Sequence, residues 1–231
     1  MSNRVDQAAL RAFYESKESR KAFGETSVLG RMREEAVSKG ENEVSEAVRN
    51  NPGLLLEIGP GPGASAKKWK EAGHEVIVLD LSHFLLRTLS DRFRAVQGTG
   101  SILPFRNGMF RFVFCDSVLM HLDLESAVRE CRRILAPGGQ LVIVEPLSGN
   151  PWMSLWRRFD TTYGRIASWH SLEAVEEQLR RQFSSVRTEL FYANPPLALL
   201  PNRLRGILKL DQAILKLKPS LAWMGVFVAR T

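Results

Sequence analysis

Cysteine is scarce in this sequence, which has only Cys115 and Cys131 among 231 residues. A disulfide framework and a thiolate-rich metal cluster are therefore excluded, and we predict no metal site. No apolar run approaches the roughly 20 residues that span a bilayer, and the first residues lack the apolar core of a signal peptide. We therefore expect a soluble, cytoplasmic protein.

Positive charge is present but unevenly distributed. The chain carries a formal net charge of +7, of which +6 lies in residues 151–231, while residues 1–50 are neutral. An anionic partner would therefore meet the last third of the chain. The 44% hydrophobic and 25% charged residues are typical of a globular domain, which excludes a wholly disordered chain.

Apolar runs alternate with amphipathic segments from residue 51 onward, after two predicted helices at 4–22 and 27–49. This alternation predicts an α/β fold with a mostly parallel sheet and helices on both of its faces. The expected strands are 54–58, 75–79, 94–97, 112–115, 140–144, 186–192 and 222–229, of which the last two form a closing pair. The expected later helices are 63–73, 83–93, 123–135, 170–183 and 202–217.

A glycine-rich loop, Glu57-Ile58-Gly59-Pro60-Gly61-Pro62-Gly63, lies between the first strand and its helix. Glycines there let the backbone turn tightly and come close to a ligand. Asp80 ends the second strand, where an acid can accept hydrogen bonds from both ribose hydroxyls of an adenosine. The glycine-rich loop and Asp80 together predict a cofactor that contains adenosine. The alternative is that the glycines serve only to form the turn.

Two cofactor classes fit this loop. Gly59-x-Gly61-x-x-Ala64 matches the dinucleotide pattern, which holds a pyrophosphate at a helix N-terminus. S-adenosylmethionine has no phosphate and carries a sulfonium and an amino group, so the acidic Glu57 suits it better. We favour S-adenosylmethionine and keep a nicotinamide-dependent Rossmann enzyme as an alternative.

Residues 53–146 resemble the class I S-adenosylmethionine-dependent methyltransferases, in particular the small-molecule group that includes the ubiquinone and menaquinone methyltransferases. LLLEIGPGPG resembles their cofactor loop, VIVLDLS their ribose-binding strand end and GTGSILPF the segment beside the adenine. FVFCDSVLMHL and RRILAPGGQLVIVEP resemble the fourth and fifth strands with their neighbouring turns. The resemblance implies a Rossmann-like, doubly wound, seven-stranded, mostly parallel sheet with a C-terminal antiparallel strand. It also implies an N-terminal helical cap (1–50), a cofactor-binding core (51–150) and a substrate-side region that completes the sheet (151–231).

The resemblance also implies the cofactor contacts. The methionine end would meet Glu57, Gly59, Gly61, Gly63, Asp116 and Ser117; the ribose would meet Asp80; the adenine would meet Leu81, Ser101 and Ile102. The chain departs from the family at Gly98-Thr99-Gly100, where Gly-Asp-Ala is usual and the Asp often meets the adenine amino group. This departure puts that single contact in doubt.

Three residues are candidates for catalysis: His121, Glu145 and Tyr14. Methyl transfer from a sulfonium needs a general base only when the acceptor atom carries a proton. His121 has a suitable pKa range and would face the cleft, or it would pack under the cofactor. Glu145 ends the fifth strand and could act on substrate or hold a loop. Tyr14 could close over the cofactor or belong to the core.

The last third of the chain would select the substrate. Residues 151–170 contain Trp152, Trp156, Phe159, Tyr163 and Trp169, which predict a lid over an apolar substrate or an aromatic-packed helix. The segment 203–218 predicts a basic amphipathic helix, which could contact an anionic membrane peripherally or simply cover the sheet.

We therefore expect an S-adenosylmethionine-dependent methyltransferase that acts on O, C or N of a small or lipid-like molecule, as a monomer or homodimer. Asn194-Pro195-Pro196 matches the start of a motif of amino-methylating nucleic-acid enzymes. It follows a late strand instead of the fourth, so a nucleic-acid substrate is less favoured. A non-catalytic cofactor-binding protein is the remaining alternative.

Overall fold

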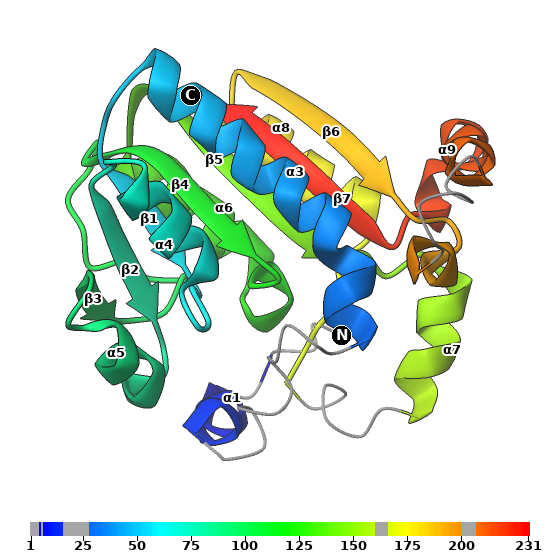
Figure 1. Cartoon of the computed structure of the whole chain (residues 1–231), viewed down its shortest axis with the longest axis horizontal. Coiled ribbons are helices and arrows are strands. Elements are labelled where there is room, and N and C mark those ends of the chain that lie inside the picture. Colours follow the sequence, from blue (N-terminus) through cyan, green and yellow to red (C-terminus); the bar gives the residue numbers. More distant parts are fainter. Residues whose placement is uncertain (1–4, 6, 16–27, 160–165, 200–206) are drawn as a thin grey trace.

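The computed structural model describes residues 5, 7–15, 28–159, 166–199 and 207–231. Its centre is one seven-stranded sheet with the strand order β3-β2-β1-β4-β5-β7-β6 (Figure 1). The strands are β1 (Leu55–Ile58), β2 (Val76–Asp80), β3 (Arg94–Gln97), β4 (Phe110–Asp116), β5 (Leu135–Pro146), β6 (Ser185–Phe191) and β7 (Met224–Arg230). Strands β1 to β5 are parallel, and β7 is antiparallel to both β5 and β6. The predicted fold class is thus confirmed.

Helices cover both faces of the sheet. They are α1 (Gln7–Glu15), α3 (Val28–Asn50), α4 (Ala64–Glu71), α5 (His83–Leu89), α6 (Leu124–Ile134), α7 (Pro151–Phe159), α8 (Leu172–Gln182) and α9 (Leu208–Leu217). Figure 1 shows α3 crossing one face of the sheet, with α6 and α8 behind it. Among the described helices, none combines the length and the apolar composition that crossing a membrane requires.

Two apolar cores lie against the two faces of the sheet. One contains Ala36 and Val44 of α3 with Trp69 of α4, and the other contains Val128 of α6 with Leu179 of α8. Both faces of the central strands are covered, which explains why β1 and β2 are buried along their whole length and consist almost entirely of apolar residues. Strand β2 ends on the polar Asp80, and β1 carries Glu57 one residue before its end.

The element boundaries differ from the sequence predictions in a few places. The helix expected at 83–93 ends at Leu89, although its predicted cap is confirmed because the Ser82 side chain accepts a hydrogen bond from the Leu85 amide. Pro137-Gly138-Gly139, predicted as a turn, lies inside β5, because Leu135 already pairs with Phe110 before the register shifts. Residues 16–22 and 202–206 of two predicted helices lie outside the described residues.

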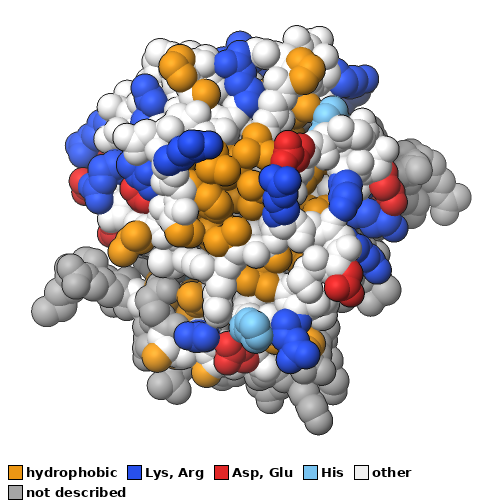
Figure 2. Space-filling model, turned by 90° about the vertical axis from the view of Figure 1, so that its left-hand side faces the viewer, with side chains coloured by type: hydrophobic (Ala, Val, Ile, Leu, Met, Phe, Trp, Pro, Cys, Tyr) orange, Lys and Arg blue, Asp and Glu red, His pale blue; other side chains and the backbone are white. Residues whose placement is uncertain are grey.

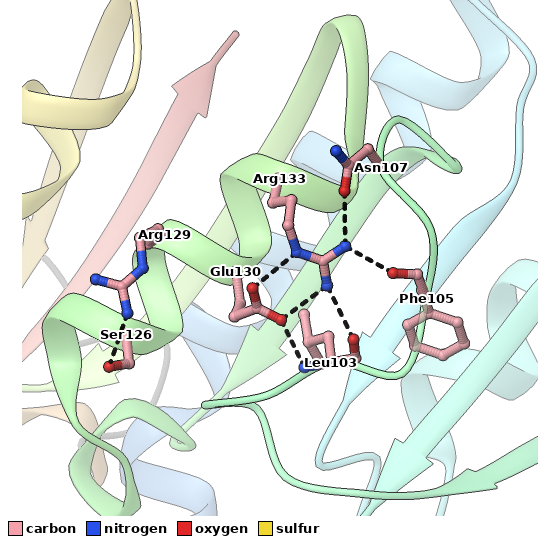
Figure 3. Close-up of polar contacts among 7 residues, drawn as sticks. All are labelled: Leu103, Phe105, Asn107, Ser126, Arg129, Glu130 and Arg133. Carbon is pink, nitrogen blue, oxygen red and sulfur yellow. Dashed lines mark hydrogen bonds and ion pairs between the residues drawn. The ribbon is translucent and has the colours of Figure 1, made fainter.

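The segment between β3 and β4 has no helix and instead is held by α6. Arg133 donates to the carbonyl oxygens of Phe105 (2.7 Å) and Leu103 (2.9 Å), and Glu130 accepts from the Leu103 amide at 2.7 Å (Figure 3). Apolar side chains gather at the centre of this end of the molecule, with Lys and Arg around them (Figure 2). The contacts of Arg133 and Glu130, which we call the α6 clamp, fix the path of the segment between β3 and β4.

Candidate functional site

A cleft of about 860 Å³ opens at the carboxyl ends of the central strands. Its walls include Ile58 at the end of β1, Asp80 at the end of β2, Asp116 at the end of β4 and Pro146 at the end of β5. Strand β1 lies between β2 and β4: the chain runs outward from β1 through β2 to β3 and then crosses back to β4 on the other side of β1. Such a switch point is where open α/β sheets bind their ligands.

The glycine loop forms the floor of this cleft. Gly59 and Gly61 have φ angles of +69° and +52°, which residues other than glycine rarely adopt. A Cβ atom on Gly59 would lie 2.5 Å from Val118, whereas one on Gly61 would meet nothing within 4 Å, so Gly61 faces open space. Gly63 is the N-cap of α4 and is not part of the cleft lining.

Glu57 supplies negative charge beneath the loop. It is 3% exposed, and its Oε2 atom has no hydrogen-bond partner among the described residues. Burial raises the pKa of Glu57 well above its ordinary value, and the nearby Asp116 and Glu41 raise it further. Acidic side chains outnumber Arg33 and Lys68 in the cleft lining, and this suits the cationic end of S-adenosylmethionine better than a pyrophosphate. The residues present therefore fit S-adenosylmethionine.

Asp80 and Leu81 line the neighbouring part of the cleft, as the resemblance implied for the ribose and adenine. The Asp80 carboxylate accepts a hydrogen bond from the Ser82 amide at 2.7 Å. Burial raises the pKa of Asp80 to about 6, against the lowering effect of the Ser82 and Leu81 amides. An acid held in this way can accept from the two ribose hydroxyls.

The adenine side is built differently from the sequence expectation. Gly98, Thr99 and Gly100 line the cleft, while Ser101 and Ile102 are not part of the lining and Ile102 is 74% exposed. The backbone turns at this point, where Ile102 donates to the Thr99 carbonyl at 3.2 Å. The three residues that depart from the family pattern, Gly98, Thr99 and Gly100, thus line the cleft, and the adenine contact of Ser101 and Ile102 stays a prediction.

Asp116 and Ser117 follow β4 and line the cleft as expected. Ser117 has a φ of 55°, a strained conformation for a residue with a side chain, and its hydroxyl donates to Asp116 at 3.2 Å. Asp116 forms an ion pair with Arg33 of α3. Burial raises the pKa of Asp116, and Arg33 opposes this shift.

Arg33 is a cleft residue that the sequence analysis missed. Arg33, Val37 and Glu41 follow one another at four-residue intervals and all line the cleft. The i, i+4 spacing places them on one face of α3. That stripe was readable in the sequence, but nothing there indicates that this face meets the cofactor loop.

Tyr14 and His121 meet at the opposite wall. The Tyr14 hydroxyl lies 2.9 Å from His121 Nε2, and His121 Nδ1 lies 2.7 Å from the Ile166 carbonyl oxygen. Burial lowers the pKa of His121, and the Ile166 carbonyl opposes this shift. Both side chains line the cleft, so the structure brings these two predicted residues together.

Glu145, the third predicted catalytic residue, is fully buried and is not part of the cleft lining. Its two carboxylate oxygens accept from the Leu119 amide at 3.1 Å and the Met120 amide at 2.9 Å. Burial raises the pKa of Glu145 to about 8, against the lowering effect of these two amides. This geometry matches the second of the two roles considered for Glu145 above, in which it holds a loop, here the turn after β4.

The far end of the cleft is apolar. Its lining includes Met120, Met153, Trp156, Trp169, Trp223 and Met224. The Arg157 guanidinium lies 3.8 Å from the centre of the Trp169 ring, which fixes that ring by a cation–π contact. Two of the aromatic residues predicted for a lid thus reach the cleft, while Tyr163 lies outside the described residues. In the described ranges, no three His, Cys, Asp or Glu side chains are arranged to hold a metal ion.

Fold and site together define a Rossmann-like protein built to bind S-adenosylmethionine. Residues 56–143 match the family described as methyltransferase domain. The chain is 30% identical over 139 residues to malonyl-[acyl-carrier protein] O-methyltransferase of Enterobacter lignolyticus, covering 56% of this chain and 55% of the relative. It is 29% identical over 113 residues to demethylmenaquinone methyltransferase of Paenarthrobacter aurescens, covering 47% and 44%.

The fold has a solved counterpart over nearly its whole length. An S-adenosylmethionine-dependent methyltransferase from Thermotoga maritima, a possible histamine N-methyltransferase, superposes with a TM-score of 0.67 at 17% identity. The superposition covers 96% of this chain and 99% of that one. Over its central part the chain is thus similar to S-adenosylmethionine-dependent methyltransferases, and it spans about half the length of the curated relatives it matches.

Proposed function

We propose that the protein transfers a methyl group from S-adenosylmethionine to an apolar, lipid-like small molecule. The observation that carries this proposal is the wall of Met and Trp side chains at the far end of the cleft. Sites for apolar ligands have such linings, with a few polar groups that set orientation. A relative named for demethylmenaquinone, a lipid-like quinone, supports the same acceptor class.

S-adenosylmethionine, when bound, supplies a methyl group on a positively charged sulfur. The residues of this chain would do the remaining work by holding the acceptor in line with that methyl group. Trp156 and Trp169 form flat apolar walls, and Met153 can adapt to the shape between them. Positioning alone can supply up to roughly 7–11 kcal/mol of rate enhancement.

The Tyr14–His121 pair is our candidate for proton removal. Because the Ile166 carbonyl can only accept, His121 Nδ1 carries the hydrogen and Nε2 accepts from the Tyr14 hydroxyl. An acceptor hydroxyl that donates to the Tyr14 oxygen can pass its proton to Tyr14 while Tyr14 passes its own proton to His121 Nε2. The pair matters only for acceptors that carry a proton on the reacting atom.

Product formation with a labelled methyl donor tests the acceptor class. The protein is incubated with methyl-labelled S-adenosylmethionine and separate apolar and water-soluble fractions of a metabolite extract. We expect label in the apolar fraction, and none with Asp80→Ala, which removes the predicted ribose contact. Label confined to the water-soluble fraction would contradict the acceptor class, and binding of the cofactor without any product would favour a non-catalytic role.

We further propose that the acceptor is collected at an anionic membrane surface. The α7–α9 surface, which we define by its exposed apolar residues, consists of Trp152, Leu155, Phe159, Ile207, Leu210 and Leu217. Phe159 is 79% exposed and Leu217 is 88% exposed, and Lys209, Lys216 and Lys218 are exposed beside them. Apolar side chains with flanking lysines are the composition that binds anionic lipid surfaces.

Hydrogen bonds connect the two helices of this surface, which lie at the same end of the molecule (Figure 1). The Trp152 indole donates to Asn194 at 3.2 Å, and Asn194 in turn donates its backbone amide to Asp211 of α9 at 2.9 Å. Asp211 is buried, so the acid that interrupts the apolar stripe of the predicted helix points inward. Asn194, the first residue of the Asn-Pro-Pro sequence, thus links Trp152 of α7 to Asp211 of α9.

A further inference from the structure

Strand β6 forms an open edge of the sheet. Among the described strands it pairs only with β7, and its seven residues, Ser185–Phe191, keep one register along that pairing. Figure 1 shows β6 at one edge of the sheet and the shorter β3 at the other. An edge strand can pair with a strand of another molecule unless proline, a bulge or charge prevents it. Because β6 contains no proline and its register with β7 does not shift, its charges decide what can pair with it.

The two charged residues of β6 are Arg187 and Glu189. They are two positions apart, so their side chains point to the same face of the sheet. Arg187 forms an ion pair with Glu43 of α3, and the ammonium group of Lys39 of α3 lies 3.2 Å from the Glu189 carboxylate. The side chains of Arg187 and Glu189 are still 58% and 46% exposed. Each can therefore form a second ion pair at the open edge.

The sequence of β6 is complementary to itself when a second copy runs antiparallel to it. With Thr188 opposite its own copy, Arg187 of each chain lies opposite Glu189 of the other. On the other face, Val186 of each chain lies opposite Leu190 of the other, and both are half-buried apolar residues packed on the core. Opposite charges and apolar pairs that face each other directly stabilise an antiparallel pair of strands. The five central residues of β6 are thus all matched.

The charges also select this register. Residues that lie directly opposite each other share a face of the sheet, so the two-fold axis must pass through a residue. Moving the axis to Arg187 would place two arginines opposite each other, and moving it to Glu189 would do the same with two glutamates. Like charges in these positions are destabilising. The other edge strand, β3, contains the single charged residue Arg94, so it offers no such match.

We propose that two copies of the chain associate through β6, with a two-fold axis at Thr188 and one continuous sheet through both copies. The contact is isologous, so it closes as a dimer and does not propagate into a fibre. Glu43 and Arg187 of one copy, followed by Glu189 and Lys39 of the other, form a row of alternating charges that occurs twice by symmetry. The axis reverses the direction of the strands, so the two clefts open in opposite directions.

Sedimentation equilibrium of the full chain, without cofactor or acceptor, tests this interface independently of the proposed function. Wild-type protein should show a reversible monomer–dimer equilibrium, and its dissociation constant should rise with salt because the exposed charge pairs are screened. Glu189→Lys leaves only positive charges on β6, and Arg187→Glu leaves only negative ones. In each variant two attractive pairs become repulsive, so the dissociation constant should rise about tenfold.

An equimolar mixture of these two variants should restore the association. The positive β6 of Glu189→Lys then faces the negative β6 of Arg187→Glu, so both charge pairs are attractive again, and the heterodimer should be about as stable as the wild-type dimer. The matched control is Arg94→Glu on the β3 edge. Arg94 is 75% exposed and lies 2.9 Å from Glu75, and its reversal should leave the dimer unchanged.

Three results would overturn the proposal: a wild type that stays monomeric at its highest soluble concentration, a dimer that neither charge reversal weakens, and a mixture that remains as dissociated as its components. If a reversed charge prevents folding, Arg187→Gln and Glu189→Gln take its place. Each removes the two attractive pairs without adding repulsion and should raise the dissociation constant about threefold. An unchanged dissociation constant in both would equally contradict the β6 interface.

Discussion

The Tyr14 hydroxyl and His121 Nε2 lie 2.9 Å apart although 107 residues separate them in the chain. This contact joins α1 to the turn that follows β4, and both residues line the cleft. A second contact supports it, because the Ser82 hydroxyl donates to the Tyr14 carbonyl at 3.4 Å. These two hydrogen bonds thus hold α1 against His121 and against Ser82, which follows β2.

Replacing Tyr14 by Phe should lower the turnover number. The hydroxyl that bridges toward His121 would be lost, and general acid–base catalysis typically contributes about 10²- to 10⁴-fold. His121→Ala should lower turnover at least as much with an acceptor that carries a proton. Steady-state kinetics with the identified acceptor measures both variants.

The affinity for S-adenosylhomocysteine is the control for this pair, and it should change little in Tyr14→Phe. Full turnover in both variants would show that the pair only packs beside the cofactor. Because burial lowers the pKa of His121, the wild-type rate should fall only at pH values below the ordinary histidine range, where Nε2 becomes protonated.

Cofactor affinity should weaken in acid because of Asp80. Its pKa is about 6, and only the ionised carboxylate accepts from both ribose hydroxyls. The dissociation constant of S-adenosylhomocysteine should therefore rise as the pH falls through about 6 and level off about tenfold above its value at neutral pH. Asp80→Asn should bind about tenfold more weakly at neutral pH. It should also lose this part of the pH dependence, and a variant that retains it would assign the titration to Glu57 instead.

Glu145 should prove to be a support for the loop after β4. Glu145→Ala leaves two buried amides without an acceptor, which should lower the free energy of unfolding by about 2–4 kcal/mol. Glu145→Gln keeps one acceptor oxygen and should retain both fold and turnover. Chemical denaturation and steady-state kinetics together measure this, and a folded but inactive Glu145→Gln would restore the catalytic role.

The same residue should make stability depend on pH. Its pKa in the folded protein is about 8, above the ordinary 4.5, because the ionised form is buried. The stabilising contribution of the protonated form is therefore complete below about 4.5 and lost as the pH rises through about 8. Denaturation midpoints of the wild type should decline over that window relative to Glu145→Gln, and parallel curves would contradict the shift.

Membrane binding should depend on the α7–α9 surface. Leu155→Ser combined with Phe159→Ser should reduce binding to phosphatidylglycerol vesicles by at least about tenfold, because two apolar side chains no longer enter the lipid. Ile102→Ser is the matched control, since Ile102 is 74% exposed and follows β3 at the opposite edge of the sheet. Flotation measures all three proteins, and equal flotation of the double variant and the wild type would contradict the proposed surface.

The sheet and the cofactor end of the cleft were predictable from local patterns. Apolar runs mark strands that are buried on both faces. Gly59 and Gly61 directly follow one such strand, and Asp80 ends the next, so the sequence shows where the two strands end. Arg33 was not predictable, because the face that a helix turns to a cleft depends on how it packs. Ser101 and Ile102 were assigned to the adenine by resemblance, yet that segment has no periodicity and the clamp from α6 sets its path.

Strand β7 follows β6 in the chain but lies between β5 and β6 in the sheet. While the polypeptide is being synthesised, β6 therefore has no neighbour, and the edge of β5 stays open until Met224–Arg230 has emerged. Six of the seven β7 residues are buried, so this strand closes both apolar cores at once. The nascent chain is most exposed to aggregation just before β7 leaves the ribosome, and a chaperone would be needed at that moment more than at any earlier one.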